Sequence, residues 1–267
     1  MVTRWPPLVQ MRAIVKRYGG VRALDGAGLI VYPDEVHAVV GDNAAGKSTL
    51  IKVLSGAVAP DAGEVHVDGR PVHLRGPRDA KALGIETVYQ DLALADNLDV
   101  PANIFLGRER LRAGGFLLDH RRMEREARAL LDRLRIRLPH LGRPVRVLSG
   151  GQRQCVAIAR SMAFNARLVI LDEPTASLGV AETAEVHALV RDLRAHGVAV
   201  VLISHNLTHV FGLTDRITVM KAGRTVGSLR TASATHEDVI RMIMTGVAGD
   251  GTVGSPVDCS GSTSDGA

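Results

Sequence analysis

Short apolar runs alternate with helical repeats along this chain. Three of the runs are continuous, as in strands that a parallel sheet buries on both faces: EVHAVVG (35–41), RLVILDE (167–173) and VAVVLISH (198–205). A fourth run, IETVYQ (85–90), indicates another strand. Apolar runs separated by helical segments predict α/β architecture with a mostly parallel sheet.

The helical repeats consist of apolar residues spaced three and four positions apart. One set comprises Ala127, Leu130, Leu131 and Leu134, and another comprises Val186, Leu189, Val190 and Leu193. KSTLIKVLSG (47–56) predicts a further helix, which Gly56 closes. The helical region at about 91–150 interrupts the alternation, so we expect it to form an inserted α-helical subdomain.

Two other segments complete this layout. EVHVDGRPVHL (64–74) alternates around Asp68-Gly69, which is the turn sequence of a β-hairpin and predicts a pair of antiparallel strands. Residues 246–267 are rich in glycine and serine, so we expect them to be disordered.

The bulk composition is that of a globular protein, with 267 residues of which 46% are hydrophobic and 23% charged. The longest apolar run, VAVVLI (198–203), is far shorter than the about 20 residues that a membrane-spanning helix needs. The N-terminus lacks an apolar core followed by a small-residue cleavage site, and Cys155 and Cys259 make neither a metal pattern nor a disulfide framework. We therefore expect a cytoplasmic protein.

Positive charge gathers in the middle of the chain. The formal net charge is +5, and much of the excess lies between Arg108 and Arg146, a stretch without lysine. Aromatic residues make up only 3% of the chain, which disfavours nucleic-acid binding. Two interpretations stay open: solvated helix faces, which we favour, and contact with acidic lipid headgroups or an acidic partner.

GDNAAGKSTL (41–50) matches the pattern G-x-x-x-x-G-K-[ST], which cradles phosphates between a strand and a helix. Lys47 would reach the β- and γ-phosphates of a nucleotide, and the Ser48 hydroxyl would bind Mg²⁺. A turn that binds nothing is the alternative, which the flanking strand and helix disfavour. The predicted ATP-binding residues of this loop are Gly41, Asp42, Asn43, Ala44, Ala45, Gly46, Lys47, Ser48 and Thr49.

Two carboxylates end the apolar run RLVILDE. Asp172 could hold the Mg²⁺ shell, directly or through water, and Glu173 could activate the water that attacks the γ-phosphate. Alone, the pair could simply cap a strand. Downstream of a phosphate-binding loop, it favours nucleotide hydrolysis over binding without hydrolysis.

A second candidate anion-binding site lies in VLSGGQRQCVAIARSMAF (147–164), where LSGGQ precedes an amphipathic helix. A hydroxyl and exposed N–H groups meet there at a helix start. A plain glycine helix start is the alternative, but the pentapeptide is far more specific. With it, the chain resembles the ATP-binding subunit of an ABC transporter over residues 8–246.

The resemblance implies the domain organisation of the chain. It implies one ATP-binding domain over residues 8–246, with a P-loop NTPase core, an antiparallel β subdomain and the helical subdomain inserted at about 91–150. Residues 1–7 and 247–267 would be tails, the second of them flexible.

The resemblance also assigns roles to further residues. Tyr18 lies where an aromatic ring stacks on adenine, Gln90 where a glutamine senses Mg²⁺ and the attacking water, and His205 where a histidine contacts the γ-phosphate. The plainer alternatives are an exposed tyrosine in a turn, a glutamine after a strand and a histidine that caps one. The catalytic candidates are Glu173 and His205, the metal candidates are Ser48, Gln90 and Asp172, and the residues that would act on a partner's ATP are Ser149, Gly150, Gly151 and Gln152.

Partners follow from the same resemblance. Two such domains would pair head to tail around ATP, so that binding closes the pair and hydrolysis reopens it. Since the chain carries one set of motifs, it would need a second ATP-binding subunit, as in a homodimer, together with transmembrane permease subunits. A sugar-binding protein outside the cytoplasm would complete the system, and the chain would lie at the cytoplasmic face of the membrane as a peripheral protein that binds no nucleic acid.

Several segments are similar to ATPases of bacterial sugar importers of the ribose, xylose and fructose type, in their single-domain form. These segments are GDNAAGKSTLIKVLSGA, GIETVYQDLAL, NIFLGRE and LISHNLTHVF. We therefore expect import of a monosaccharide into a bacterial cell.

Two positions depart from the common pattern of the family. Ala44 stands where a glycine is usual, and alanine at a positive φ would cost about 1–2 kcal/mol. Gly179 stands where most members have an aspartate that serves coupling between subunits; the sugar-import branch commonly tolerates glycine there, so we interpret it as a trait of that branch.

The sequence disfavours two rival functions. A non-transport ABC ATPase acting on nucleic acid or ribosomes usually carries coiled-coil arms, zinc-binding cysteine pairs or two ATPase domains, and the sequence has none of these. A regulator that binds nucleotide without hydrolysis is disfavoured because Lys47, Asp172, Glu173 and His205 are all present.

Overall fold

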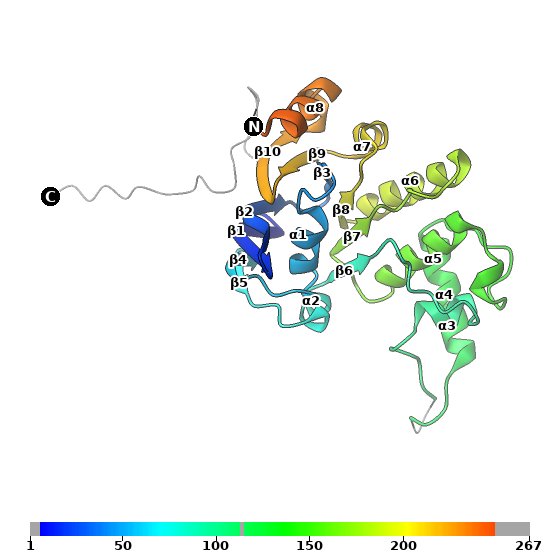
Figure 1. Cartoon of the computed structure of the whole chain (residues 1–267). Coiled ribbons are helices and arrows are strands. Elements are labelled where there is room, and N and C mark those ends of the chain that lie inside the picture. Colours follow the sequence, from blue (N-terminus) through cyan, green and yellow to red (C-terminus); the bar gives the residue numbers. More distant parts are fainter. Residues whose placement is uncertain (1–5, 113–114, 249–267) are drawn as a thin grey trace. The chain divides into compact units, whose positions relative to one another are not determined.

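The computed structural model describes residues 6–112 and 115–248, drawn in colour in Figure 1. The predicted tails, residues 1–7 and 247–267, lie largely outside these ranges, and so does Cys259. The chain divides into two compact units. Of the described residues, one unit holds 6–80 and 203–248, and the other holds 81–112 and 115–202.

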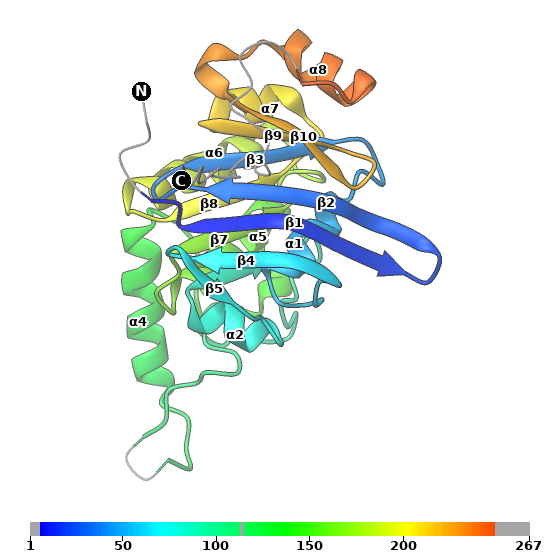
Figure 2. The same ribbon diagram turned by 90° about the vertical axis from the view of Figure 1, so that its left-hand side faces the viewer.

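A four-stranded antiparallel sheet belongs to the first unit, and Figure 2 shows its strands side by side. The strands are β1 (Val9–Tyr18), β2 (Val21–Val31), β4 (Ala62–Val67) and β5 (Arg70–Val72), in the order β2-β1-β4-β5. The hairpin predicted around Asp68-Gly69 is confirmed as β4–β5. Both turn residues have positive φ, 50° and 75°, as the tightest hairpin turns require.

β1 and β2 were not predicted from the hydrophobic pattern, and a bulge in β1 explains why. Ala13 has a φ of 49°, and the pairing register of β1 with β2 shifts between Met11 and Ile14. A bulge shifts the alternation of side chains between the two faces of a sheet. The period of two that marks a strand is therefore broken within VQMRAIVKRY.

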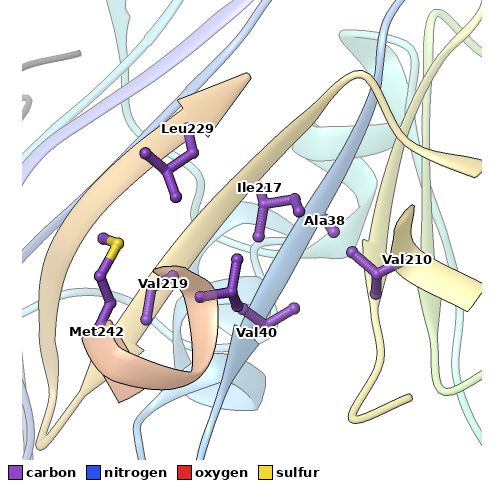
Figure 3. Close-up of a cluster of buried hydrophobic side chains, with 8 residues drawn as sticks. Ala38, Val40, Val210, Ile217, Val219, Leu229 and Met242 are labelled. Atoms are coloured by element: carbon purple, nitrogen blue, oxygen red, sulfur yellow. The ribbon is translucent and has the colours of Figure 1, made fainter. Parts of the chain in front are cut away.

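The first unit also holds three strands of the second sheet, which is mostly parallel. β3 (Val36–Gly41) pairs in parallel with β9 (Arg216–Lys221), and β9 pairs in antiparallel fashion with β10 (Arg224–Arg230). Side chains of these strands pack with α7 (Leu207–Leu213) and α8 (His236–Thr245), as Figure 3 shows. This cluster consists of Ala38, Val40, Val210, Ile217, Val219, Leu229, Val239 and Met242.

α1 (Lys47–Leu54) follows β3 directly and confirms the helix predicted over 47–56. It buries Leu50, Ile51, Val53 and Leu54. Gly56 has a φ of 70°, the left-handed conformation that closes helices, as predicted. Because α1 follows β3 directly, the N-terminus of α1 lies at the phosphate-binding loop, which connects the two elements.

The second unit contains the other predicted parallel strands. β6 (Ile85–Val88) pairs in parallel with β7 (Leu168–Asp172), and β8 (Ala199–Ile203), which ends one residue beyond the unit, follows β7 in the strand order. β7 and β8 are buried almost throughout, as their continuous apolar runs predict.

Helices and loops make up the rest of this unit, and Figure 1 labels the helices. They are α3 (Val100–Ile104), α4 (His120–Arg133), α5 (Gly150–Met162) and α6 (Val180–Ala195), with a 3₁₀ turn η1 (Val145–Val147) before α5. α2 (Pro77–Ala82) lies at the boundary of the two units, and a second 3₁₀ turn, η2 (Thr231–Ser233), precedes α8. The predicted apolar repeats are the buried faces of α4 and α6.

The arginine-rich stretch forms ion pairs at the surface of α4. Glu126 accepts from Arg110 Nε at 2.7 Å and from Arg122 Nε at 2.8 Å, and Glu124 accepts from Arg128 Nη2 at 3.0 Å. Exposed pairs of this kind contribute about 0–1 kcal/mol each. Arg122 and Arg128 thus lie on an exposed face of α4, in keeping with the interpretation favoured from the sequence.

Over the described ranges, none of the helices is both long and apolar enough to cross a lipid bilayer.

A buried polar network fixes the start of β3 against β9. His37 Nδ1 lies 3.1 Å from Glu35 Oε1, and Arg216 Nε lies 3.4 Å from Glu35 Oε2. Burial by itself would raise the pKa of the Glu35 carboxyl, but the hydrogen bonds from His37 and from the Tyr32 N–H, together with the charge of Arg216, lower it below the ordinary value of 4.5. Glu35 is therefore ionised in the folded protein at neutral pH.

We expect Glu35→Gln to lower the free energy of unfolding by about 3 kcal/mol, because it leaves Arg216 and His37 without their buried anion. The pKa of Glu35 is lower in the folded state, so its contribution is full above about pH 4.5 and is lost as the pH falls through the folded value. Urea titrations between pH 3 and 7 measure both effects. Glu64→Gln is the control, because Glu64 also pairs with a histidine two residues away but is exposed. Equal losses for the two variants would contradict this account.

Candidate active site

The phosphate-binding loop connects β3 to α1 in the first unit, and two glycines allow its path. Gly41 has a φ of 151°, and a Cβ there would lie 2.2 Å from the carbonyl oxygen of Met220. Gly46, the N-cap of α1, has a φ of 98°, and a Cβ there would lie 2.7 Å from the carbonyl oxygen of Ala23. Any side chain at either position would collide with backbone. Glycine is therefore required at both ends of the loop.

Lys47 supplies positive charge at this loop. Its Nζ donates hydrogen bonds to the carbonyl oxygens of Gly41, at 2.8 Å, and Asp42, at 2.9 Å. The first turn of α1 has no acidic residue. The ammonium group and the positive end of the helix thus lie at the same place, and both attract a polyphosphate. Of the other predicted loop residues, Asn43 lies in the loop, Ala45 is buried, and Ser48 and Thr49 lie in the first turn of α1.

Ala44 adopts a left-handed backbone conformation, with a φ of 66°. This is the conformation for which alanine was expected to be costly. The strain of about 1–2 kcal/mol falls in the middle of the loop.

Ala44→Gly is expected to raise the free energy of unfolding by about 1 kcal/mol, because glycine reaches the same backbone conformation without strain. Urea titration measures the change. Ala45→Gly, at the next position but without a positive φ, is the matched control and should not raise the stability. Unchanged or lower stability in Ala44→Gly would mean that the loop tolerates alanine at no cost.

Two other predicted residues belong to the first unit. Tyr18 is the last residue of β1, and 46% of its surface is exposed, with Lys16 Nζ 5.9 Å from the ring centre. The ring is accessible to a stacking partner. His205 is exposed and lies between β8 and α7, where Asn206 caps the helix.

In the second unit, the ends of two neighbouring parallel strands bring Asp172 and Gln90 to one edge of the sheet. Val88 pairs with Leu171, and Asp172 is the next residue after Leu171, whereas Gln90 lies two residues after Val88. A carboxylate and an amide oxygen at the same edge are suitable ligands for Mg²⁺. The spacing of these residues therefore fits their predicted role.

Glu173 follows Asp172 and has a φ of 50°. A left-handed conformation is uncommon for glutamate and costs on the order of 1 kcal/mol, and such strain clusters at functional sites. The chain leaves β7 at this residue, which places the carboxylate in the loop just after the strand.

Ser149 is the N-cap of α5 and forms a capping box with Gln152. The N–H of Gln152 donates to Ser149 Oγ at 3.3 Å, and the N–H of Ser149 donates to Gln152 Oε1 at 3.1 Å. The LSGGQ motif thus builds its own helix start, with no acidic residue in the first turn. Ser149 therefore caps the N-terminus of α5, the helix end at which the sequence predicts that an anion binds.

One residue at this site was missed from the sequence. Glu182, in the first turn of α6, accepts hydrogen bonds from the N–H of Gly151 at 3.3 Å and from the N–H of Gly179 at 3.2 Å. A glutamate three residues after a helix start is a capping signal, which would have predicted the bond to Gly179. The bond to Gly151 joins residues 31 positions apart and has no signal in the sequence.

Comparison with known proteins gives the same family as the motifs. The profile of a family described as "ABC transporter" matches residues 24–176. The chain is 47% identical to a fructose import ATP-binding protein of Rhizobium meliloti, over 90% of this chain and 94% of that protein. It is 42% identical to a xylose/arabinose import ATP-binding protein of Sulfolobus acidocaldarius, over 88% of this chain and 93% of that protein. A ribose import ATP-binding protein of Rubrobacter xylanophilus is 47% identical over 89% of this chain, which spans 47% of that relative's length.

Solved structures confirm the fold class. The ATP-binding cassette of an ABC transporter, solved in its ADP conformation, has a TM-score of 0.76 to this chain at 25% identity, covering 90% of this chain and 96% of the other. The family resemblance stated from LSGGQ and the other motifs is therefore confirmed, and so is the α/β P-loop architecture. With the family profile spanning more than half of its length and relatives aligned almost end to end, this chain belongs to the ABC transporter family.

Proposed function

We propose that this chain is the ATP-hydrolysing subunit of a transporter that imports a monosaccharide into a bacterial cell. The observation that carries this proposal is the match to the fructose import ATP-binding protein over 94% of that protein's length. The relatives named above import fructose, ribose or xylose/arabinose by their names, and none of them is named for nucleic acid or ribosomes. The nucleic-acid alternative thus gains no support.

ATP binds at the phosphate loop in this proposal. The main-chain N–H groups between Gly41 and Gly46 face phosphate oxygens, and Lys47 moves its hydrogen bonds from loop carbonyls to the β- and γ-phosphates. The exposed ring of Tyr18 stacks on adenine, and His205 contacts the γ-phosphate. These contacts orient the terminal phosphate for attack by water.

Mg²⁺ is the metal that the donor set fits. Ser48, Gln90 and Asp172 would hold it through a hydroxyl, an amide oxygen and a carboxylate, all of them hard oxygen ligands. When bound, the ion neutralises charge on the phosphates. Glu173 then orients the attacking water and takes its proton at a carboxylate oxygen.

The signature motif acts across a pair of subunits in this proposal. Ser149, Gly150, Gly151 and Gln152 present a polarised helix end to the γ-phosphate of ATP held by a second copy. ATP has a higher affinity for the closed pair than for the open one, and hydrolysis removes this preference. Permease subunits follow the motion, and an extracytoplasmic sugar-binding protein delivers the sugar. The chain is then peripheral at the cytoplasmic face of the membrane.

The partner part of the proposal is tested by fractionation. Expressed alone, the chain is expected to remain in the supernatant after ultracentrifugation, because no described helix can span a bilayer. Expressed with the permease of its gene neighbourhood, most of it should sediment with membranes and purify with a tagged permease. An unrelated permease is the control. A chain that stays wholly in the supernatant beside its own permease would contradict the transporter role.

A further inference from the structure

One carboxylate in the second unit contacts both the signature motif and the loop that follows Glu173. We propose that Glu182 is a positioning residue that holds Gly151 in a fixed arrangement with Gly179, so that the signature motif and the loop after β7 move as one body. The proposal rests on the proposed role of the signature motif at a partner's ATP.

Two backbone N–H groups donate hydrogen bonds to the Glu182 carboxylate. The Gly151 N–H donates to Oε1 at 3.3 Å, and the Gly179 N–H donates to Oε2 at 3.2 Å. The Ser149 hydroxyl is the largest cause that lowers the pKa of Glu182, followed by these two N–H groups. The glutamate is therefore ionised at neutral pH, and charge-assisted hydrogen bonds are the stronger kind.

Close packing leaves these groups no alternative arrangement. A Cβ on Gly151 would lie 2.8 Å from Glu182 Cβ and 3.0 Å from its Cγ, and a Cβ on Gly150 would lie 3.1 Å from Leu178 Cδ2. The first turn of α5 thus touches the first turn of α6 and the loop before it. The two glycines of the signature motif are needed for this contact.

Electrostatics stabilises the same arrangement. α5 has no acidic residue in its first turn, and Glu182 is the acidic residue in the first turn of α6. Its carboxylate lies at the positive ends of two helices at once. Gly179 makes its contact with this carboxylate through the backbone N–H.

The test uses the full chain with Glu173→Gln, so that bound ATP persists. Adding Glu182→Ala is expected to weaken ATP-dependent pairing in sedimentation velocity by about tenfold, since hydrogen bonds to a charged group are lost. The ATP affinity of a single subunit, measured by titration below the pairing concentration, should not change. In the parent chain the same substitution should lower kcat about tenfold and leave KM unchanged.

Two further variants serve as a conservative replacement and a matched control. Glu182→Gln keeps one acceptor oxygen and should recover part of the pairing, and it replaces Glu182→Ala if that variant is unstable. Glu185→Ala removes an exposed glutamate one turn further along α6 and is the matched control, with no loss expected. Amide hydrogen exchange gives a separate readout: Gly151 and Gly179 should exchange faster in Glu182→Ala than in Glu185→Ala.

The outcomes separate this inference from the proposed function. If Glu173→Gln alone does not pair with ATP, the sandwich is wrong, and amide exchange at Gly151 and Gly179 still decides whether Glu182 holds them. If Glu173→Gln pairs, but Glu182→Ala pairs equally well and its amides exchange as slowly as in the control, the positioning role is overturned. Loss of single-subunit ATP affinity along with pairing would also overturn it, because that result indicates a general structural defect.

Discussion

Glu173→Gln is expected to reduce ATP hydrolysis by about 10²–10⁴-fold while ATP still binds. Glutamine has nearly the same size and can occupy the same left-handed position, where φ is 50°, but it cannot take a proton from water. Asp172, at the end of β7, remains to hold the metal. Phosphate release with saturating ATP and Mg²⁺ measures the loss, and calorimetry measures binding. Glu237→Gln, at an exposed position of α8, is the control.

The same variant should change the state of assembly. ATP that is not hydrolysed would hold two copies together, so sedimentation with ATP and Mg²⁺ should show Glu173→Gln as a dimer and the parent chain mostly as a monomer. Adding Ser149→Arg should return the variant to monomer, because a bulky cation at the N-cap of α5 blocks the partner's γ-phosphate. A double variant that still dimerises would contradict the sandwich. Normal hydrolysis by Glu173→Gln would remove Glu173 from its catalytic role.

Lys47→Ala is expected to weaken ATP binding by about 100-fold or more, since each hydrogen bond between an ammonium group and a phosphate contributes about 1.5–3 kcal/mol. Lys47 Nζ is held within 2.9 Å of two loop carbonyls, close to where the phosphates would lie. Transport and hydrolysis should be lost as well.

Lys52→Ala provides the matched control for this experiment. Lys52 lies on the same helix, in its last turn, and is exposed. Its removal changes the net charge equally and should leave ATP affinity almost unchanged. A folded Lys47→Ala chain with the ATP affinity of the parent, measured by calorimetry, would contradict the assignment of the phosphate loop.

The strands that sequence patterns predicted best are those buried on both faces. β7 and β8 are continuous apolar runs, because helices or other layers cover both sides of a parallel strand. β1 could not be predicted in this way. Its bulge at Ala13 breaks the alternation, and a bulge is set by the pairing of strands rather than by local residue preference.

In the candidate site, too, local residues could be predicted and residues brought together by packing could not. Lys47, Glu173 and Ser149 could be predicted because each belongs to a short motif whose residues are neighbours in the chain. Glu182 could not be predicted as a contact of the signature motif, because only the packing of α6 against α5 brings its carboxylate to Gly151.

The sequence by itself determined the chemistry of this protein: a phosphate loop, a pair of carboxylates after a buried strand, and a helix start built for an anion. Local spacing is enough for these features, since backbone geometry over a few residues sets which groups point together. Tertiary structure alone decided how such pieces are held. It set Glu35 between His37 and Arg216, and joined Gly151 to Gly179 through Glu182. These outcomes depend on contacts between residues distant in sequence, and side-chain packing in three dimensions decides which of those contacts form.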